Sequence, residues 1–199
     1  MSSFAPTTDA RDFLLQQQKE EDSHLELLTD YVRTHMRTDA PVSLYLKKLD
    51  RIMLEAIEKE DYIASVFIQN FIVEGLNISL LRELEHHADG TLSELCTTIL
   101  REELGHMEFG VNEIKRILKE TTNPKLERNL LRLQRKVLFY SIGLSIDLAR
   151  EAKDLSIPVG EFAEKTVSEH ALRIKEVNLP LPLIDRVLYK LAVLFLKAI

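Results

Sequence analysis

The sequence predicts an all-α protein that forms a single domain over residues 1–199, and three features indicate this. Glycine and proline number only six each, so few positions interrupt regular structure. Apolar residues recur every three or four positions along most of the chain, which is the period of one helix face. A hydrophobic content of 45% is enough for a chain of 199 residues to bury a substantial core.

The expected helices follow one another with short connections. Their approximate bounds are 9–36, 42–58, 61–87, 91–122, 124–154, 159–176 and 183–197.

The first three helices are justified by their ends and by their apolar faces. Residues 1–10 are polar and contain a proline, so we expect a flexible tail there; the first helix ends before Pro41. The second helix is amphipathic. The third is apolar nearly all round between Tyr62 and Leu81, which is typical of a helix in the core.

Local signals mark the starts of the later helices. Gly90 suits the C-terminal cap of the third helix, and Thr91-Leu92-Ser93-Glu94 has the pattern of a capping box that starts the fourth. Asn123 and Pro124 fit an N-cap followed by a proline in the first turn, so a fifth helix begins there. The last two helices are separated by Leu179-Pro180-Leu181-Pro182.

Composition limits the functional class. A net charge of −6 argues against a surface that binds nucleic acid through phosphate contacts. Cys96 is the only cysteine, which excludes an intrachain disulfide, and the N-terminus lacks the basic and apolar regions of a signal peptide. The longest apolar stretch, Tyr62 to Leu81, contains several polar residues and is expected to be a buried helix rather than a membrane span. We expect a cytoplasmic protein.

Two Glu-x-x-His pairs suggest a metal site. Glu21 and His24 are three positions apart, as are Glu103 and His106, so each pair lies on one helix face. Glu74 is the only charged residue between positions 62 and 81. A buried carboxylate is costly unless it is paired or bound to a metal.

The turn near Gly90 relates these residues to one another. If the third and fourth helices form an antiparallel hairpin there, the position level with Glu74 is close to 104, between Glu103 and His106. Carboxylates together with one imidazole per metal suit iron or manganese and leave open positions for dioxygen. The sequence therefore predicts a metal site inside the bundle.

This pattern resembles a known family. The runs FIQNFIVEGLNI (67–78) and REELGHMEFG (101–110), with the upstream pair at Glu21, are similar to those of the ferritin-like di-iron carboxylate oxygenases, and most similar to the aldehyde-deformylating oxygenases. The resemblance covers about residues 13–118. It implies a ferritin-like bundle, with metal-site helices over 11–120 and additional C-terminal helices over 121–199.

The resemblance also implies a function and a set of ligands. The implied activity is that of a non-haem di-iron oxygenase or oxidase with two iron ions, or with manganese. Such a protein uses dioxygen, a hydrophobic small molecule such as a fatty aldehyde, and an external electron donor. The five implied metal ligands are Glu21, His24, Glu74, Glu103 and His106. The apolar residues near Glu74 that we expect to line a substrate channel are Phe71, Ile78 and Leu81.

One ligand of the family pattern is missing. The family has an earlier helix whose carboxylate precedes the first Glu-x-x-His, whereas only twenty residues precede Glu21 here. Asp147 and Tyr140 are candidate substitutes, but Asp147 lies off the expected level of the site and Tyr140 is the weaker ligand type. Three explanations stay open: the chain lacks a first helix, a later helix or a partner chain such as the second copy in a homodimer fills the gap, or the site is incomplete.

Other interpretations compete with the oxygenase. The protein could be a metal-depleted helical binding or structural protein, a ferritin-like iron-oxidising protein, or a relative of the transfer-RNA hydroxylases. Glu20, Glu102 and Glu108 are expected to be surface charges or to support the ligands. Gly105 and Gly110 either let a neighbour approach closely or are simply tolerated.

Overall fold

The computed structural model describes residues 1–35, 42–88, 90–121, 123–149, 152 and 156–198. The described chain is helical and contains no strand, which confirms the all-α prediction. Its helices are α1 (Thr8–His35), α2 (Leu44–Glu58), α3 (Tyr62–Val66), the π-helix η2 (Phe67–Val73), α4 (Glu74–His87), α5 (Gly90–Glu120), α6 (Pro124–Asp147), α8 (Val159–Glu176) and α9 (Leu183–Ala198). The end of the expected fifth helix, towards residue 154, lies largely outside the described residues.

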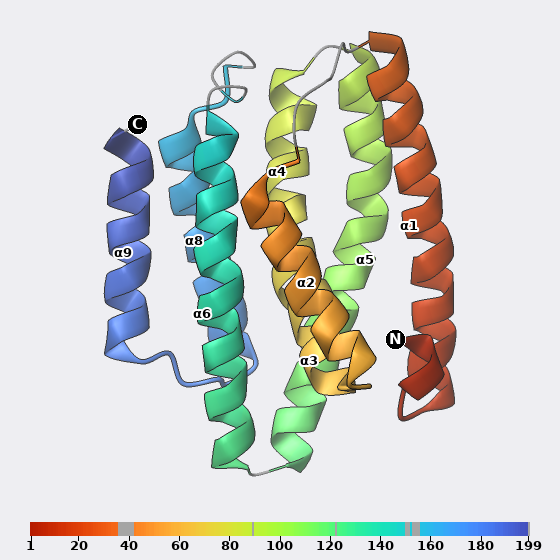
Figure 1. Ribbon diagram of the computed structural model, residues 1–199, viewed down its shortest axis with the longest axis vertical. Coiled ribbons are helices and arrows are strands. Elements are labelled where there is room, and N and C mark those ends of the chain that lie inside the picture. The colour runs from red at the N-terminus through yellow and green to blue at the C-terminus, as the bar shows by residue number, and fades with distance from the viewer. Residues whose placement is uncertain (36–41, 89, 122, 150–151, 153–155, 199) are drawn as a thin grey trace.

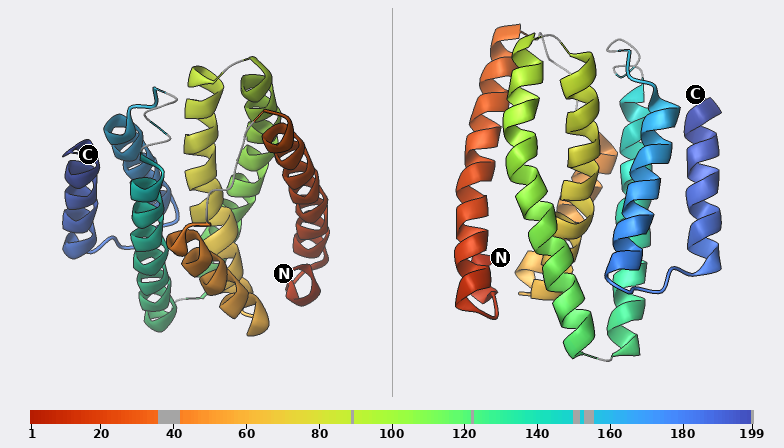
Figure 2. Two further views of the ribbon diagram at one scale, coloured as in Figure 1. Left: turned by 45° about the horizontal axis from the view of Figure 1, so that its top comes forward. Right: turned by 180° about the vertical axis from the view of Figure 1, so that it is seen from behind.

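The helices form an elongated bundle with α1 at one edge and α9 at the other (Figures 1 and 2). Helices α4 and α5 are antiparallel neighbours, as the hairpin prediction requires, and α1 packs against α5. On the other side of α4 lies α8, which in turn contacts α9. Helix α2 packs against α3 and α6. The α4–α5 pair is thus the centre of the bundle.

The N-terminal segment differs from the flexible tail expected for residues 1–10. Ser2–Phe4 form one turn of 3-10 helix, and α1 begins at Thr8. The side chains of Met1 and Phe4 pack against the main core, and Ala10 is only 5% exposed. Burying these apolar groups stabilises the ordered turn, an effect that the polar composition of the segment conceals.

The third expected helix is interrupted in its hydrogen-bond pattern. Between α3 and α4, the residues of η2 adopt a π-helix, a form that occurs mostly as short insertions at functional sites. Gly110 of α5 lies directly against this segment, because a Cβ atom there would come within 2.6 Å of the backbone carbonyl carbon of Asn70. Gly105, by contrast, has no such neighbour within 4 Å. The absence of a side chain at Gly110 therefore permits the close approach of α5 to η2, whereas no neighbour approaches Gly105.

The turn between α4 and α5 also differs from the prediction. The C-cap of α4 is Ala88, whose N–H donates to the carbonyl of Leu84. Gly90 is the first residue of α5 and has no positive φ, so it does not cap α4. Thr91 consequently lies inside the helix rather than at its N-cap. The expected cap at Asn123 is confirmed, since its side chain accepts bonds from the backbone N–H groups of Lys125 and Leu126.

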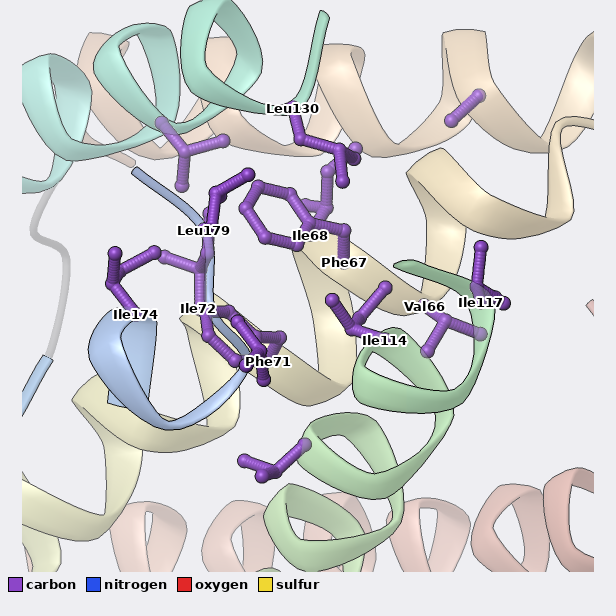
Figure 3. Close-up of a cluster of buried hydrophobic side chains, with 14 of the residues drawn as sticks. Val66, Phe67, Ile68, Phe71, Ile72, Ile114, Ile117, Leu130, Ile174 and Leu179 are labelled. Atoms are coloured by element: carbon purple, nitrogen blue, oxygen red, sulfur yellow. The ribbon is translucent and has the colours of Figure 1, made fainter. Parts of the chain in front are cut away.

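The main core surrounds η2 (Figure 3). Phe67, Phe71 and Ile72 are 0% exposed, and their neighbours include Ile114 of α5 and Leu179. Tyr62–His87 is long and apolar enough to cross a membrane by length and composition alone. However, 61% of its most apolar window is buried in the bundle, as expected for a core helix.

Candidate metal centre

Four of the five expected ligands converge inside the bundle. Glu21 of α1, Glu74 at the start of α4, and Glu103 and His106 of α5 each offer a ligand atom, and these four atoms all lie within 4.8 Å of one another. The level predicted from the hairpin is therefore correct. Glu74, Glu103 and His106 are buried, whereas the side chain of Glu21 is 36% exposed.

The fifth residue, His24, lies at the edge of this group. Its ring nitrogen Nδ1 is 3.4 Å from Glu103 Oε1 and 3.7 Å from Glu21 Oε2. His24 is 4% exposed, and Nδ1 has no hydrogen-bond partner within the described part of the chain. The imidazole thus directs an unpaired nitrogen towards the carboxylates.

The two histidines are held by a reciprocal pair of carboxylates. His24 Nε2 lies 2.7 Å from Glu102 Oε2, and His106 Nε2 lies 2.8 Å from Glu20 Oε2. Each supporting residue directly precedes the Glu of the opposite motif, because α1 and α5 are antiparallel and both carry Glu-Glu-x-x-His. An ionised carboxylate only accepts hydrogen bonds, so Nε2 carries the hydrogen in each ring. In the neutral form of each ring, Nδ1 is then the nitrogen with a free lone pair.

Glu21 and Glu103 each lie between the two imidazoles. Glu103 directs Oε1 towards His24 and Oε2 towards His106, the latter at 3.2 Å. Glu21 directs Oε2 towards His24 and Oε1 towards His106, and each oxygen lies 3.7 Å from Nδ1 of that histidine. A carboxylate with one oxygen near each of two imidazoles has the arrangement of a bridging ligand. Glu74 has no such contacts with both rings, but its ligand oxygen lies within 4.8 Å of the ligand nitrogen of His106.

Glu74 is surrounded by side-chain amides. Its Oε1 accepts from Gln69 Nε2 at 2.8 Å and from Gln17 Nε2 at 3.2 Å, and its Oε2 accepts from Asn77 Nδ2 at 3.3 Å. Glu74 is 0% exposed. Burial, followed by the hydrogen bond and the negative charge of Glu103, raises the pKa of Glu74 well above its usual value. Glu74 therefore keeps its proton to a higher pH than a solvated carboxyl group does.

The pKa values of its neighbours Glu103 and His106 shift in opposite directions. Burial raises the pKa of Glu103, but hydrogen bonds with His106 and Glu74 outweigh this effect, so the net pKa is lowered. Burial lowers the pKa of His106, but its hydrogen bonds with Glu103 and Glu20 outweigh that, so the net pKa is raised. Glu74 and His106 thus hold protons more strongly than free side chains do, whereas Glu103 releases its proton more readily.

The residues fit a divalent metal by their own chemistry. Three carboxylates and two imidazoles with outward Nε2–H groups match the donor set of iron or manganese sites, in which a carboxylate commonly orients each histidine. The unpaired Nδ1 of buried His24 supports the same conclusion, since buried polar atoms rarely lack a partner.

The donor set is unequal on its two sides. The side near His106 has Glu74 as well as the two carboxylates that lie between the rings, whereas the side near His24 has only those two. The group of four contains no residue of α6, α8 or α9. Asp147 is exposed and accepts from Ser43 Oγ, and Tyr140 packs against the hydrophobic core. Neither belongs to the group.

A cavity of about 310 Å³ lies beside the centre, between α2, η2, α4, α6, α8 and α9. Its wall includes Gln69 and Asn77, two of the three amides that donate to Glu74.

The expected channel residues do not line this cavity. Phe71, Ile78 and Leu81 are 0%, 1% and 8% exposed and belong to the packed interior. The expectation is therefore corrected: on α4, the cavity is bounded by the face that carries Asn77 and Leu80 instead.

Sequence reasoning missed part of the site. Gln17 is 3% exposed and also accepts from Asn70 Nδ2 at 2.7 Å. It lies one helical turn before Glu21 on the same face, which is a signal that the spacing rule could have found. The roles of Glu20 and Glu102 depended on the antiparallel packing of α1 and α5, although the repeated Glu-Glu-x-x-His was visible.

Comparison with known proteins adds no family assignment. No protein-family model matches the sequence, and no curated protein matches it.

Proposed function

We propose that this protein is a non-haem iron oxygenase or oxidase of the di-iron carboxylate type. It would use dioxygen and an external electron donor to act on a hydrophobic small molecule. The observation that carries the proposal is the reciprocal support of the histidines. Glu20 fixes His106 and Glu102 fixes His24, so both Nδ1 atoms face the same carboxylates. Surface charge alone does not require this arrangement.

The five residues would hold the metal in defined roles. His24 and His106 would each offer Nδ1, Glu21 and Glu103 would each offer carboxylate oxygens on both sides, and Glu74 would offer its carboxylate on the His106 side. Bound iron would supply the reduction of dioxygen at coordination positions that the protein leaves open. The missing terminal carboxylate predicts unequal affinity, with the position near Glu103 and His106 the stronger one.

The residues around the five expected ligands orient these ligands and shape the substrate cavity. Gln69 and Asn77 orient Glu74 from the cavity side, and Glu20 and Glu102 orient the histidines. Glu74 gives up its proton when a cation binds, which couples metal binding to proton release. The largely apolar cavity wall beyond the amides suits a hydrophobic substrate.

Anaerobic titration with ferrous iron, followed by exposure to dioxygen, tests this function. We expect at least one iron ion to bind per chain, and dioxygen consumption to increase when a medium-chain aldehyde or alkane is added. Glu74→Gln keeps the size of the side chain but removes the carboxylate, so it should lose most of the iron binding and the dioxygen consumption. Retention of both by this variant, or absence of iron binding by the native protein, contradicts the proposal.

A further inference from the structure

The wall of the cavity carries polar atoms that lack partners. His170 is 1% exposed, and within the described chain neither of its ring nitrogens has a hydrogen-bond partner. Thr166, one turn earlier on α8, is 6% exposed, and its Oγ1 is likewise unpartnered among the described residues. Both residues line the cavity. Leaving buried donors and acceptors unpaired is costly, so their presence side by side indicates a polar group that they bind.

Ion pairs fix the height of these residues in the bundle. Lys165 lies 3.4 Å from Glu83, and Arg82 lies 3.3 Å from Glu169, so α8 runs antiparallel to α4. This register places His170 close to the level of Asn77. Thr166 and His170 therefore lie in the part of the cavity that is near the amides that contact Glu74.

Most of the remaining wall is apolar, although it also includes Asp50, Ser141 and Ser145. Nearer the start of α8 and towards the end of α6, the cavity is bounded by Val159, Phe162, Leu144 and Leu148. A ligand that matches this cavity has one polar group and an apolar body. Since each water in a liquid occupies about 30 Å³, the cavity has room for roughly ten non-hydrogen atoms.

The polar pair of the wall, His170 and Thr166, is uncharged, and the one acidic residue of the lining, Asp50, is exposed. His170 packs against the rings of Phe71 and Tyr189, with centroid distances of 6.0 and 6.2 Å. Burial and the nearby charge of Arg173 lower the pKa of His170 to about 3, so the ring is neutral and offers one donor and one acceptor. The hydroxyl of Thr166 offers the same combination. Such a wall suits a hydroxyl or carbonyl group, which can be bonded without burying a net charge.

We propose that the cavity binds a medium-chain apolar molecule carrying one uncharged hydroxyl or carbonyl group, which hydrogen-bonds to His170 and Thr166. The apolar chain of this molecule lies along α8 and α6. The ligand would be the substrate, or a close analogue of the substrate, of the proposed oxygenase, and to that extent the inference rests on the proposed function. Binding itself requires no metal.

Binding of 1-octanol, octane and octanoate to the metal-free protein tests the inference. Equilibrium uptake of the two volatile compounds is measured in the headspace, and octanoate binding by calorimetry. An uncharged hydrogen bond contributes a factor of about five in affinity, so 1-octanol should bind at least about fivefold more tightly than octane. Because no metal is present, the result does not depend on whether iron binds.

Three variants distinguish the contribution of the polar residues to ligand binding from the contribution of the cavity as a whole. Thr166→Val, which keeps the side-chain shape, and His170→Leu should both remove the preference for 1-octanol while octane still binds. Ser145→Ala is the control, because Ser145 also lines the cavity but its Oγ already donates to the carbonyl of Ser141. Equal binding of octane and 1-octanol to the native protein, no binding of either, or tighter binding of octanoate would overturn the proposal.

Discussion

Glu20 and His106 lie 86 positions apart in the sequence, and Glu20 Oε2 is 2.8 Å from His106 Nε2. Glu102 and His24 form the matching pair across the same two helices at 2.7 Å. Neither supporting carboxylate belongs to the expected ligand set, yet each decides which nitrogen of a histidine faces the centre. The pairing turns two separate Glu-x-x-His motifs into one site with approximate twofold symmetry.

Removal of either supporting carboxylate should weaken metal binding. Loss of the residue that orients a metal-binding histidine typically lowers affinity by about 10- to 100-fold. We therefore expect Glu20→Ala to weaken the position near His106 and Glu102→Ala to weaken the position near His24, as measured by anaerobic iron titration. Glu108→Ala is the matched control, because Glu108 is exposed on the same helix as Glu102. Equal affinities in all three variants would show that the pairing has no part in metal binding.

Metal affinity should increase with pH. The pKa values of Glu74 and His106 are both raised in the metal-free protein, and both groups must lose their protons to act as ligands. At low pH, protons compete with the metal; at higher pH this competition is lost. Calorimetric titration in buffers of different ionisation enthalpy should detect proton release on iron binding. Affinity that is independent of pH, with no proton release, contradicts these protonation states.

The metal-free Glu74→Gln variant should become more stable relative to the native protein as pH rises. The folded-state pKa of Glu74 is raised above its unfolded value, so its protonation favours folding at low pH and this contribution is lost as pH rises through the folded pKa. Gln remains uncharged throughout. The variant should therefore gain in melting temperature relative to the native protein between mildly acidic and alkaline pH. A constant difference over that range would mean that Glu74 is ionised at every pH tested.

The two glycines of the second motif should respond oppositely to alanine. Gly110→Ala forces a Cβ against the backbone of Asn70, so we expect a loss of about 1–3 kcal/mol in the free energy of unfolding. Gly105→Ala meets no such neighbour and should gain up to about 1 kcal/mol, because alanine favours helix. Denaturant unfolding of both variants gives the comparison. Similar losses at both positions would mean that α5 does not approach η2 as closely as described.

Much of the fold and part of the site could be predicted from sequence because both depend on local periodicity. The hairpin turn near Gly90 and the isolated charge of Glu74 were enough to place that residue level with Glu103 and His106. The π-helix before Glu74 could not be predicted in this way. It packs against Gly110, which lies forty positions beyond Asn70 in the sequence, and such a contact is not visible in local periodicity.

The cavity was predicted least well. Phe71, Ile78 and Leu81 were chosen because they are apolar and close to Glu74 in sequence, but helix rotation directs them into the packed interior. The cavity wall is completed by α8 and α9, whose positions depend on long-range packing. His170 gave no signal in the sequence, because its significance arises from burial without a partner.

The central claim is that five residues form an unequal two-metal centre, and the most direct test is the location of iron by anomalous scattering in crystals prepared anaerobically at increasing iron concentration. We expect the first density between Glu74, Glu103 and His106, with Nδ1 of His106 as a ligand. Density near His24 should appear only at higher concentration and with lower occupancy. Two equally occupied positions at the lowest iron concentration would contradict the inequality. Iron bound elsewhere, or absent at saturation, would contradict the site itself.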